Sequence, residues 1–347
     1  CAPIMATKCL MTSENTLTQA IRPLEGSVDW LSCGDLKWEL ESHCSLNNIS
    51  KISRLKSNIS CLISKIQIMA TSYDSRYASS PEAVKKYDTT ELRKEFLIDN
   101  LMEVGKITLT YSHYDRYIAG SAVPDKPLKL ETIDPLKAAY FLERRELGII
   151  NVGDSGSVDV DGTTHKLNHK DALYIGQGAK EVVFKSDNSQ NPAKFYLNSA
   201  PAHTSYPTKK VSLAEANKLE LGSLETANHR TVNQMIIGGI VTTCQLQMGM
   251  TELKTGSVWN TMPAHVHDRR MEVYFYLDVP EGQSVCHFMG QPQETRHIWM
   301  QNHQAIISPP WSIHSGSGTS NYTFIWGMAG ENLDYGDMDV AKITNLR

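Results

Sequence analysis

Three histidines and one glutamate near the end of the chain have the residue types and the spacing of a metal-binding set. His265 and His267 lie two residues apart, Glu272 follows a short charged stretch, and His314 lies in a separate apolar segment. Side chains two residues apart on a strand point to the same face. Three imidazoles and one carboxylate are good ligands for a borderline divalent ion such as Zn²⁺. We therefore predict that these four residues hold one metal ion.

Strand-like sequence surrounds the four residues and explains how they can meet. The stretch Asp268-Arg269-Arg270 can turn the chain, and the β-branched and aromatic run at 273–277 predicts a strand that carries Glu272 back beside the histidine pair. The alternative is three unrelated histidines on the surface of a β-sandwich. It explains less well why His265 and His267 share one strand parity.

After Gly105 the chain alternates between short strand-like runs and turn signals. The strand candidates lie at 107–111, 148–152, 157–160, 171–178, 194–198, 243–250, 273–277, 284–288, 305–307 and 322–326. Short strands with regular turn signals are typical of a β-sandwich or barrel. Few helices are expected: Asp88 and Glu91 form a capping box for one, and Ser212 with Glu215 predicts a brief helix between two halves.

The two halves repeat one pattern. When the halves are aligned so that Glu146 matches Glu272, apolar residues fall at the positions of His265 and His267. When Ala172 is matched with Ala305, Glu181 falls at the position of His314. The first half therefore lacks the ligand set, and we predict one metal ion per chain, in the second half.

The first 68 residues differ from the rest, because they hold five of the seven cysteines and show poor hydrophobic periodicity. We expect residues 1–68 to be an extension that is disordered or an artefact of the reading frame. Residues 69–208 then form a first domain without metal ligands, and 209–347 a second domain with the metal site. The scarcity of cysteines after residue 68 indicates a reducing compartment.

Bulk properties exclude two classes of partner. The net charge of −4 gives no electrostatic case for nucleic acid. No run approaches the roughly 18 apolar residues that a transmembrane helix needs. We therefore expect neither a nucleic acid nor a membrane as partner.

Longer stretches of sequence carry a resemblance over residues 88–347. They lie at 140–148, 201–204, 206–210, 259–263, 272–276, 289–297 and 311–316. The histidine pair, Glu272 and His314 match the metal signature of cupins. With these stretches the chain resembles the 5-keto-4-deoxyuronate isomerase family (4-deoxy-L-threo-5-hexosulose-uronate ketol-isomerases), a bicupin family. Residues 1–68 have no counterpart in that family.

The resemblance implies an all-β bicupin, with two antiparallel β-sandwich or barrel (jelly-roll) domains and few short helices. It implies one Zn²⁺ per subunit, held by His265, His267, Glu272 and His314. The implied reaction interconverts 5-dehydro-4-deoxy-D-glucuronate and 3-deoxy-D-glycero-2,5-hexodiulosonate, in the breakdown of pectin and related uronate polymers. The implied partner is this small sugar acid, and the implied protein is a cytoplasmic homo-oligomer, a hexamer.

Residue types suggest further roles at the site. The candidates for the catalytic base are Glu294, His297, Tyr274 and Glu331. The candidates for binding the substrate carboxylate are Arg296, Arg269 and Lys209. Arginine is the better fork for a carboxylate. Proton transfer through an enediol and a metal-assisted hydride shift both stay open as routes.

Two other functions fit the same ligand set. A cupin dioxygenase would use Fe in this site and would depend on O₂. A non-catalytic sugar-acid-binding cupin is disfavoured, because the full ligand set is present in the second half and no helix-turn-helix or basic segment accompanies it.

Overall fold

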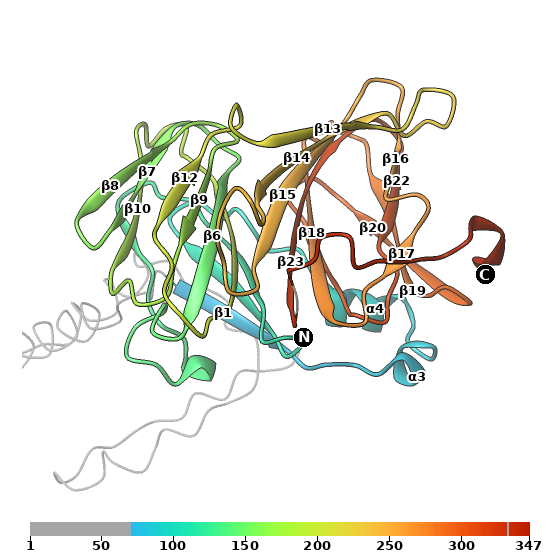
Figure 1. Cartoon of the computed structure of the whole chain (residues 1–347), viewed down its shortest axis with the longest axis horizontal. Helices are drawn as coiled ribbons and strands as arrows, with labels where there is room; N and C mark the ends of the chain where they lie inside the picture. The colour runs from blue at the N-terminus through green and yellow to red at the C-terminus, as the bar shows by residue number, and fades with distance from the viewer. Residues whose placement is uncertain (1–70, 332) are drawn as a thin grey trace, which may run out of the picture. The chain divides into compact units, whose positions relative to one another are not determined.

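The computed structural model describes residues 71–331 and 333–347. These residues form two β-sandwiches that lie side by side, the first mainly blue and green and the second mainly orange and red in Figure 1. In each sandwich a large sheet packs against a smaller one. The predicted fold class is therefore confirmed. The expected extension at 1–68 lies outside the described residues.

The first sandwich consists of two sheets. In spatial order, its large sheet contains β1 (Thr71–Arg76), β3 (Ile107–Ser112), β4 (Ile118–Ala122), β11 (Phe195–Pro201), β6 (Arg145–Asn151), β9 (Ala172–Ile175) and β12 (Lys209–Val211). Its small sheet contains β5 (Leu128–Lys129), β10 (Val182–Ser186), β7 (Gly156–Val160) and β8 (Thr163–Leu167). Paired strands run antiparallel here, except that β1 runs parallel to β3.

The second sandwich repeats this plan. In spatial order, its large sheet contains β13 (Asn217–Leu221), β14 (Arg230–Ile236), β15 (Gln247–Leu253), β23 (Thr323–Gly330), β18 (Arg270–Leu277), β21 (Ala305–Ser308) and β2 (Leu97–Ile98). Its small sheet contains β16 (Trp259–Asn260), β22 (Ser315–Gly318), β19 (Val285–Gln291) and β20 (Glu294–Met300). A separate short ladder joins β17 (His265–Val266) to β24 (Asp339–Val340).

The two sandwiches have the same strand order, so the predicted duplication is visible in the topology: β6, β9 and β11 occupy the places of β18, β21 and β23. The last strand of each large sheet comes from the other half of the chain. The early strand β2 pairs with β21, whereas β12 pairs with β9. The expected domain boundary lies between 208 and 209. β2 precedes this boundary but completes the second sandwich, and β12 follows it but completes the first. The division of the chain there stays a prediction.

Two short α-helices precede β2 in the described part of the chain. They are α3 (Pro81–Val84) and α4 (Thr89–Phe96). The predicted capping box is present at α4, where Asp88 and Glu91 each accept a backbone N–H of the other. α4 lies against β20 and β21 of the second sandwich, and none of the described helices is long and apolar enough to cross a membrane.

The other helix-like segments are single turns. Among the described residues, two 3₁₀ turns lie at Asp134–Leu136 and Ile343–Asn345. The helix predicted at Ser212 is absent, because the chain there makes one turn and then enters β13. The Glu215 N–H donates to the Ser212 carbonyl at 3.0 Å, and the Glu215 carboxylate accepts from the Ser212 hydroxyl at 2.6 Å.

Alternate residues of the large sheets face two different cores. On β6, Leu147 and Ile149 point into the core of the first sandwich. On the opposite face the two large sheets pack against each other, where the ring of Tyr196 stacks on Phe275 at 4.3 Å. The first sandwich is thus filled with apolar side chains, and its large sheet supports the sheet that carries Glu272.

The observed register corrects the predicted alignment of the two halves by one residue. Ile175, the last residue of β9, lies opposite Leu147, and Ser308, the last residue of β21, lies opposite Glu272. Leu147 therefore occupies the position of Glu272, and Glu146 does not. A shift of one residue on a strand reverses the face. Glu146 consequently points away from the core of the first sandwich.

Glu146 instead joins the two halves. Its buried carboxylate accepts hydrogen bonds from the backbone N–H groups of Cys244, Gln245 and Leu246 and from the hydroxyl of Tyr174, all between 2.7 and 2.8 Å. These contacts hold the segment before β15 on the large sheet of the first sandwich.

Candidate metal centre

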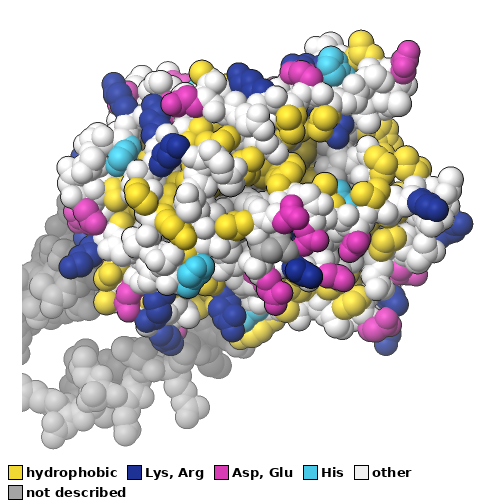
Figure 2. Space-filling view, viewed as in Figure 1, with side chains coloured by type: hydrophobic (Ala, Val, Ile, Leu, Met, Phe, Trp, Pro, Cys, Tyr) yellow, Lys and Arg dark blue, Asp and Glu magenta, His cyan; other side chains and the backbone are white. Residues whose placement is uncertain are grey.

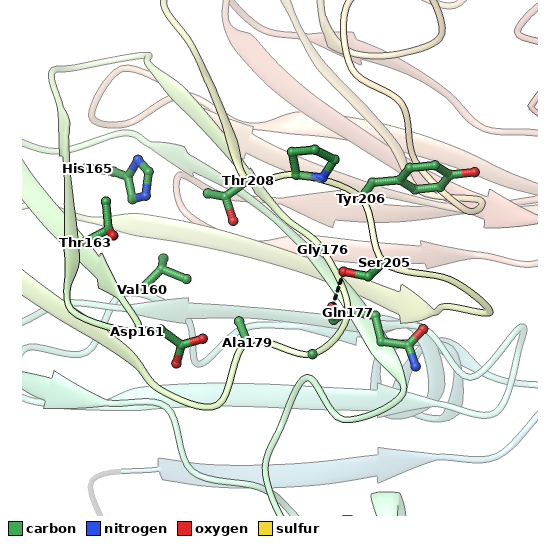
Figure 3. Close-up of a pocket in the computed structure, with 12 residues that line it drawn as sticks. Val160, Asp161, Thr163, His165, Gly176, Gln177, Ala179, Ser205, Tyr206 and Thr208 are labelled. Atoms are coloured by element: carbon green, nitrogen blue, oxygen red, sulfur yellow. Dashed lines mark hydrogen bonds between the residues drawn. The ribbon is translucent and has the colours of Figure 1, made fainter.

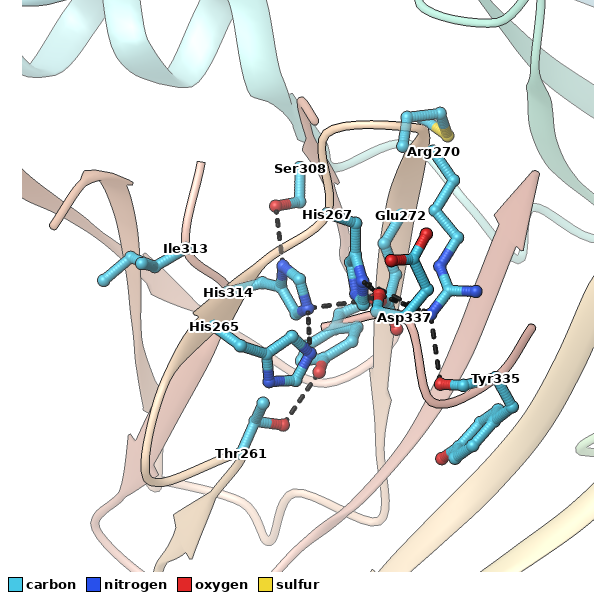
Figure 4. A network of polar contacts seen from close by, with 12 residues as sticks. Thr261, His265, His267, Arg270, Glu272, Ser308, Ile313, His314, Tyr335 and Asp337 are labelled. Atoms are coloured by element: carbon cyan, nitrogen blue, oxygen red, sulfur yellow. Dashed lines mark hydrogen bonds and ion pairs between the residues drawn. The ribbon is translucent and has the colours of Figure 1, made fainter. Parts of the chain in front are cut away.

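The four side chains chosen from the sequence come together in the second sandwich. One donor atom from each of His265, His267, Glu272 and His314 lies within 4.8 Å of every other. His314 Nε2 lies 3.0 Å from both His265 Nε2 and a Glu272 carboxylate oxygen, and His267 Nε2 lies 3.2 Å from that oxygen. Figure 4 shows the three rings turned toward the carboxylate.

Short elements bring these residues to one place. His265 lies on β17, which pairs with β24, and His267 follows directly. The chain turns at Asp268-Arg269 and returns as β18 with Glu272 on its third position, as predicted. His314 lies between β21 and β22, in a segment that also binds the backbone N–H of His267 through the Pro310 carbonyl at 3.3 Å.

Two of the imidazoles are oriented by contacts at their outer nitrogen. His267 Nδ1 lies 2.8 Å from the Asp337 carbonyl, and His314 Nδ1 lies 3.3 Å from the Ser308 hydroxyl. A histidine that donates through one ring nitrogen keeps the lone pair on the other. Both rings therefore present Nε2 to the centre of the cluster.

Burial and charge prepare the cluster for a cation. Burial, together with the neighbouring imidazoles of His314 and His267, lowers the pKa of His265 to about 2, so this ring stays neutral. Burial alone would raise the pKa of the Glu272 carboxyl, but His314 and His267 outweigh burial and lower it. Neutral imidazoles and an ionised carboxylate are the forms that bind a divalent metal ion. The donor set therefore fits such an ion.

Three members of the cluster, His265, His267 and Glu272, line a pocket of about 260 Å³. Tyr274, two residues after Glu272 on β18, lines the same pocket, and its hydroxyl is 2.8 Å from the Thr261 hydroxyl. Burial raises the pKa of Tyr274 well above its usual value, so the phenol stays protonated. On the face shown in Figure 2, hydrophobic side chains gather around a hollow on the side of the second sandwich, and basic and acidic side chains are interspersed elsewhere.

A family model described as the KduI/IolB family matches residues 97–343. The chain belongs to the KduI/IolB family. This membership confirms the resemblance predicted from the sequence.

Curated relatives in this family are similar to almost all of the described chain. A protein of Formosa agariphila is 81% identical over 280 residues, which cover 80% of this chain and 100% of the relative. A protein of Lachnoclostridium phytofermentans is 59% identical over 273 residues, which cover 78% and 99%. A protein of Bacteroides fragilis is 56% identical over 280 residues, which cover 80% and 100%. Each is named 4-deoxy-L-threo-5-hexosulose-uronate ketol-isomerase, and the predicted enzyme class, an isomerase, is confirmed.

A solved structure supports the fold alone. An IolB-like protein of Salmonella typhimurium superposes with a TM-score of 0.59 at 14% identity, over 71% of this chain and 96% of its own. The KduI/IolB fold of this chain is thus seen in a second protein whose sequence has diverged widely.

Of the predicted catalytic candidates, Tyr274 lies in the pocket wall. Glu294 and His297 lie on β20, and the Glu294 carboxylate forms an ion pair with Arg296 at 2.7 Å. Glu331 is exposed just after β23, where its N–H donates to the Arg269 carbonyl. These three candidates therefore lie away from the residues that line the pocket.

The predicted carboxylate binders also lie outside the pocket lining. Arg296 donates to the Lys85 carbonyl at 2.7 Å in addition to its ion pair. Arg269 is exposed in the turn before β18. Lys209 is exposed on β12 and donates to the Ile240 carbonyl at 2.5 Å. Their roles toward a substrate stay predictions.

Two arginines line the pocket besides the residues above. Arg270 is 1% exposed, and Arg230 is half-buried. Arg270 belongs to the charged stretch after the histidine pair, so the sequence offers it as a cation for an acidic substrate, and it shares the strand parity of Glu272 and Tyr274 on β18. Arg230 gives no sequence signal, because it reaches the site from β14, far from the histidine motif.

The first sandwich has a wider surface pocket of about 520 Å³, shown in Figure 3. Its titratable side chains are Asp161, His165 and Tyr206. The Asp161 carboxylate accepts from the backbone N–H groups of Lys180 and Glu181, so it stabilises the surrounding loops. Within the described residues, the metal-binding group is found in the second sandwich alone.

Proposed function

We propose that this chain is a metal-dependent ketol-isomerase that interconverts 5-dehydro-4-deoxy-D-glucuronate and 3-deoxy-D-glycero-2,5-hexodiulosonate. The observation that carries the proposal is the convergence of three imidazoles and one carboxylate on a pocket of small-molecule size. Family membership and the names of relatives up to 81% identical support the same reaction. The proposed physiological role is uronate catabolism, including the breakdown of pectin.

The ion that we propose is Zn²⁺, one per subunit, held by His265, His267, Glu272 and His314. Borderline-soft Zn²⁺ accepts imidazole nitrogen and carboxylate oxygen together. When bound, it supplies a Lewis acid that polarises a carbonyl oxygen. The lowered pKa of His265 supports this assignment, because a neutral imidazole need not lose a proton to bind the ion.

The reaction moves hydrogen between two neighbouring carbons. The aldehyde at C1 and the hydroxyl at C2 of the substrate become a hydroxyl at C1 and a ketone at C2. In the enediol route a proton leaves C2 and another is added at C1, whereas in a hydride shift the C2 hydrogen moves directly. Both routes place negative charge on a substrate oxygen.

We assign Tyr274 to that oxygen. The Thr261 hydroxyl, 2.8 Å away, can donate to the Tyr274 oxygen and leave the phenolic hydrogen for the substrate. The high pKa of Tyr274 keeps this hydrogen in place. A preorganised donor in a site shielded from water stabilises developing charge more than water does.

The remaining parts of the proposal concern the whole protein. By its similarity to the family we propose a cytoplasmic enzyme that assembles as a homo-oligomer, a hexamer. Its partner is the small uronate-derived sugar acid. Size measurement of the purified chain by light scattering tests the assembly.

The first experiment follows turnover without oxygen. The purified full chain is incubated anaerobically with 5-dehydro-4-deoxy-D-glucuronate in D₂O, and conversion is followed by NMR while bound metal is measured by elemental analysis. A His314→Ala variant removes one ligand, and His203→Ala serves as a control because His203 is exposed in the first half.

We expect the parent and the control to convert the substrate and to contain zinc, and the His314→Ala variant to lose both. Deuterium at the former C1 indicates the enediol route, and its absence indicates the hydride shift. An enzyme that requires O₂ and Fe would contradict the proposal, as would conversion by a metal-free chain.

A further inference from the structure

We propose that Arg230 binds the carboxylate of the substrate in the pocket beside the metal centre, an inference that rests on the proposed function. Arg230 begins β14, and it lines the same pocket as His265, Glu272 and Tyr274. Val232 lines this pocket too. Residues two apart on a strand share a face, so the parity of β14 directs both side chains toward the pocket.

The guanidinium of Arg230 carries a charge without a described counter-ion. Its Nη1 donates to the Asn228 carbonyl at 2.8 Å, and among the described residues no carboxylate forms an ion pair with it. The nearby groups that interact with its charge are the hydroxyls of Tyr274, Tyr335 and Tyr322. Burial lowers the pKa of Arg230, yet arginine stays protonated in proteins. A half-buried cation of this kind favours an anionic ligand.

Arg270, the other arginine of the pocket, is already committed to the protein. Its guanidinium donates to the backbone carbonyls of Asp334, Tyr335 and Asp337. Because the Asp337 carbonyl also contacts His267, Arg270 orients the metal centre and has little capacity left for a ligand. Arg230 is therefore the cation of the pocket that can turn toward a substrate.

The position of Arg230 matches the chemistry of the substrate. The carboxylate of 5-dehydro-4-deoxy-D-glucuronate is C6, at the opposite end of the chain from the reacting carbons C1 and C2. In the large sheet β14 is separated from β18 by β15 and β23, but the Arg230 guanidinium lies close enough to the Tyr274 hydroxyl for the two groups to interact, and Tyr274 in turn interacts with Glu272. One sugar acid can thus place its carbonyl end near Glu272 and its carboxylate near Arg230.

The indole of Trp326 adds a second donor in the same pocket wall. Trp326 is 3% exposed, and its Nε1 has no hydrogen-bond partner among the described residues. A buried donor without an acceptor is costly, and an oxygen-rich ligand would satisfy it. The pocket therefore contains, besides Arg230, a buried donor that an oxygen of a sugar acid could satisfy.

Two variants of Arg230 test the assignment by kinetics. Arg230→Gln removes the charge, and Arg230→Lys keeps it but loses the planar fork. The control is Lys218→Gln, which removes an exposed cation from the neighbouring strand β13. With the uronate substrate we expect Arg230→Gln to lower kcat/KM by about 10- to 100-fold, mainly through KM, with zinc content unchanged. Arg230→Lys should recover part of the loss, and the control should match the parent.

A binding measurement that needs no turnover separates this inference from the proposed function. D-Glucuronate and D-glucose are titrated into the zinc-loaded full chain in a calorimeter. We expect the parent to prefer D-glucuronate and Arg230→Gln to lose that preference. If the parent shows this pattern without converting the uronate substrate, the proposed reaction fails and the carboxylate site stands. If Arg230→Gln left both KM and the preference for D-glucuronate unchanged, the inference would be overturned. It would also be overturned if Arg296→Gln lost that preference and raised KM while Arg230→Gln did not.

Discussion

Two donors of the metal centre, His267 and His314, are oriented by a contact on their far side. The Asp337 carbonyl contacts Nδ1 of His267, and the Ser308 hydroxyl contacts Nδ1 of His314. These contacts leave Nε2 of each ring facing the cluster. Such outer contacts typically change metal affinity by about 10- to 100-fold when they are lost. The C-terminal segment that contains Asp337 is thus part of the site, although it supplies no ligand.

Tyr274 gives the prediction at this scale that bears on the chemistry. Tyr274→Phe removes the hydroxyl that we assign to the charged substrate oxygen and keeps the ring. We expect kcat to fall by about 10²- to 10³-fold, with KM changed little and zinc content unchanged. Steady-state kinetics with the uronate substrate, together with metal analysis, measures both.

The matched control is Tyr276→Phe. Tyr276 is also a buried tyrosine on the inner face of β18, but it pairs with His287 at 2.8 Å and does not line the pocket. Its kcat should stay within a few-fold of the parent. Equal losses in the two variants would mean that Tyr274 supports the fold and does not act on the substrate.

Residue types and spacing predicted the four clustered side chains. Two histidines two residues apart in strand-like sequence, followed by a glutamate on the next strand, form a pattern that can be recognised in the sequence. The same reasoning could not choose among Glu294, His297, Tyr274 and Glu331. Their positions depend on which face of which strand meets the pocket. Arg230 was missed altogether, since a single arginine at the start of a strand has no distinguishing pattern.

At the scale of elements, the two large sheets use one strand plan for two purposes. On β18 the inward face carries Glu272 and Tyr274, whereas the equivalent inward face of β6 carries Leu147 and Ile149. One sandwich is therefore a packed apolar core, and the other encloses a polar site. The predicted echo of the halves was right in outline but shifted by one residue, since a short repeat in sequence does not fix the register of a sheet.

Glu146 gives the prediction at the scale of elements. In the parent, the Glu146 carboxylate accepts hydrogen bonds from three backbone N–H groups. In Glu146→Gln the amide NH₂ must face at least one of these N–H groups, and two donors cannot form a hydrogen bond with each other. A buried donor left without an acceptor costs about 1–3 kcal/mol, so we expect the free energy of unfolding to fall by about 2–4 kcal/mol. Chemical denaturation measures the change.

The control for Glu146 is Glu281→Gln, which alters an exposed glutamate in a loop of the second sandwich. Its free energy of unfolding should match the parent within about 0.5 kcal/mol. If Glu146→Gln were equally harmless, the four hydrogen bonds would not hold the two sheets together.

At the scale of the whole molecule, the two sandwiches exchange the strands β2 and β12, so each half completes the sheet of the other. This exchange could not be predicted from the sequence, because a two- or three-residue strand has no periodicity and its partner is set by long-range packing. Stability is accordingly a property of the pair, and buried groups in one sandwich affect the unfolding of both.

His287 links the stability of the molecule to pH. It is fully buried between β18 and the small sheet, where the titratable groups around it are Tyr276, Tyr274, His314 and Glu272. Burial and, to a smaller extent, His314 lower the pKa of His287 to about 3 against an opposing effect of Glu272. In the unfolded chain the pKa of a histidine is about 6.5.

Between these two pKa values the unfolded chain binds a proton at His287 that the folded chain does not bind. The free energy of unfolding therefore falls as pH drops from about 6.5 toward 3, by up to about 1.4 kcal/mol per pH unit from this residue.

In His287→Asn the side-chain oxygen can still accept a hydrogen bond from Tyr276, and this pH dependence is removed. We expect the difference in stability between parent and variant to shift steadily toward the variant at pH 6.5, 5.5 and 4.5, measured by chemical denaturation. Parallel curves over this range would show that His287 binds its proton in the folded chain as readily as in the unfolded one.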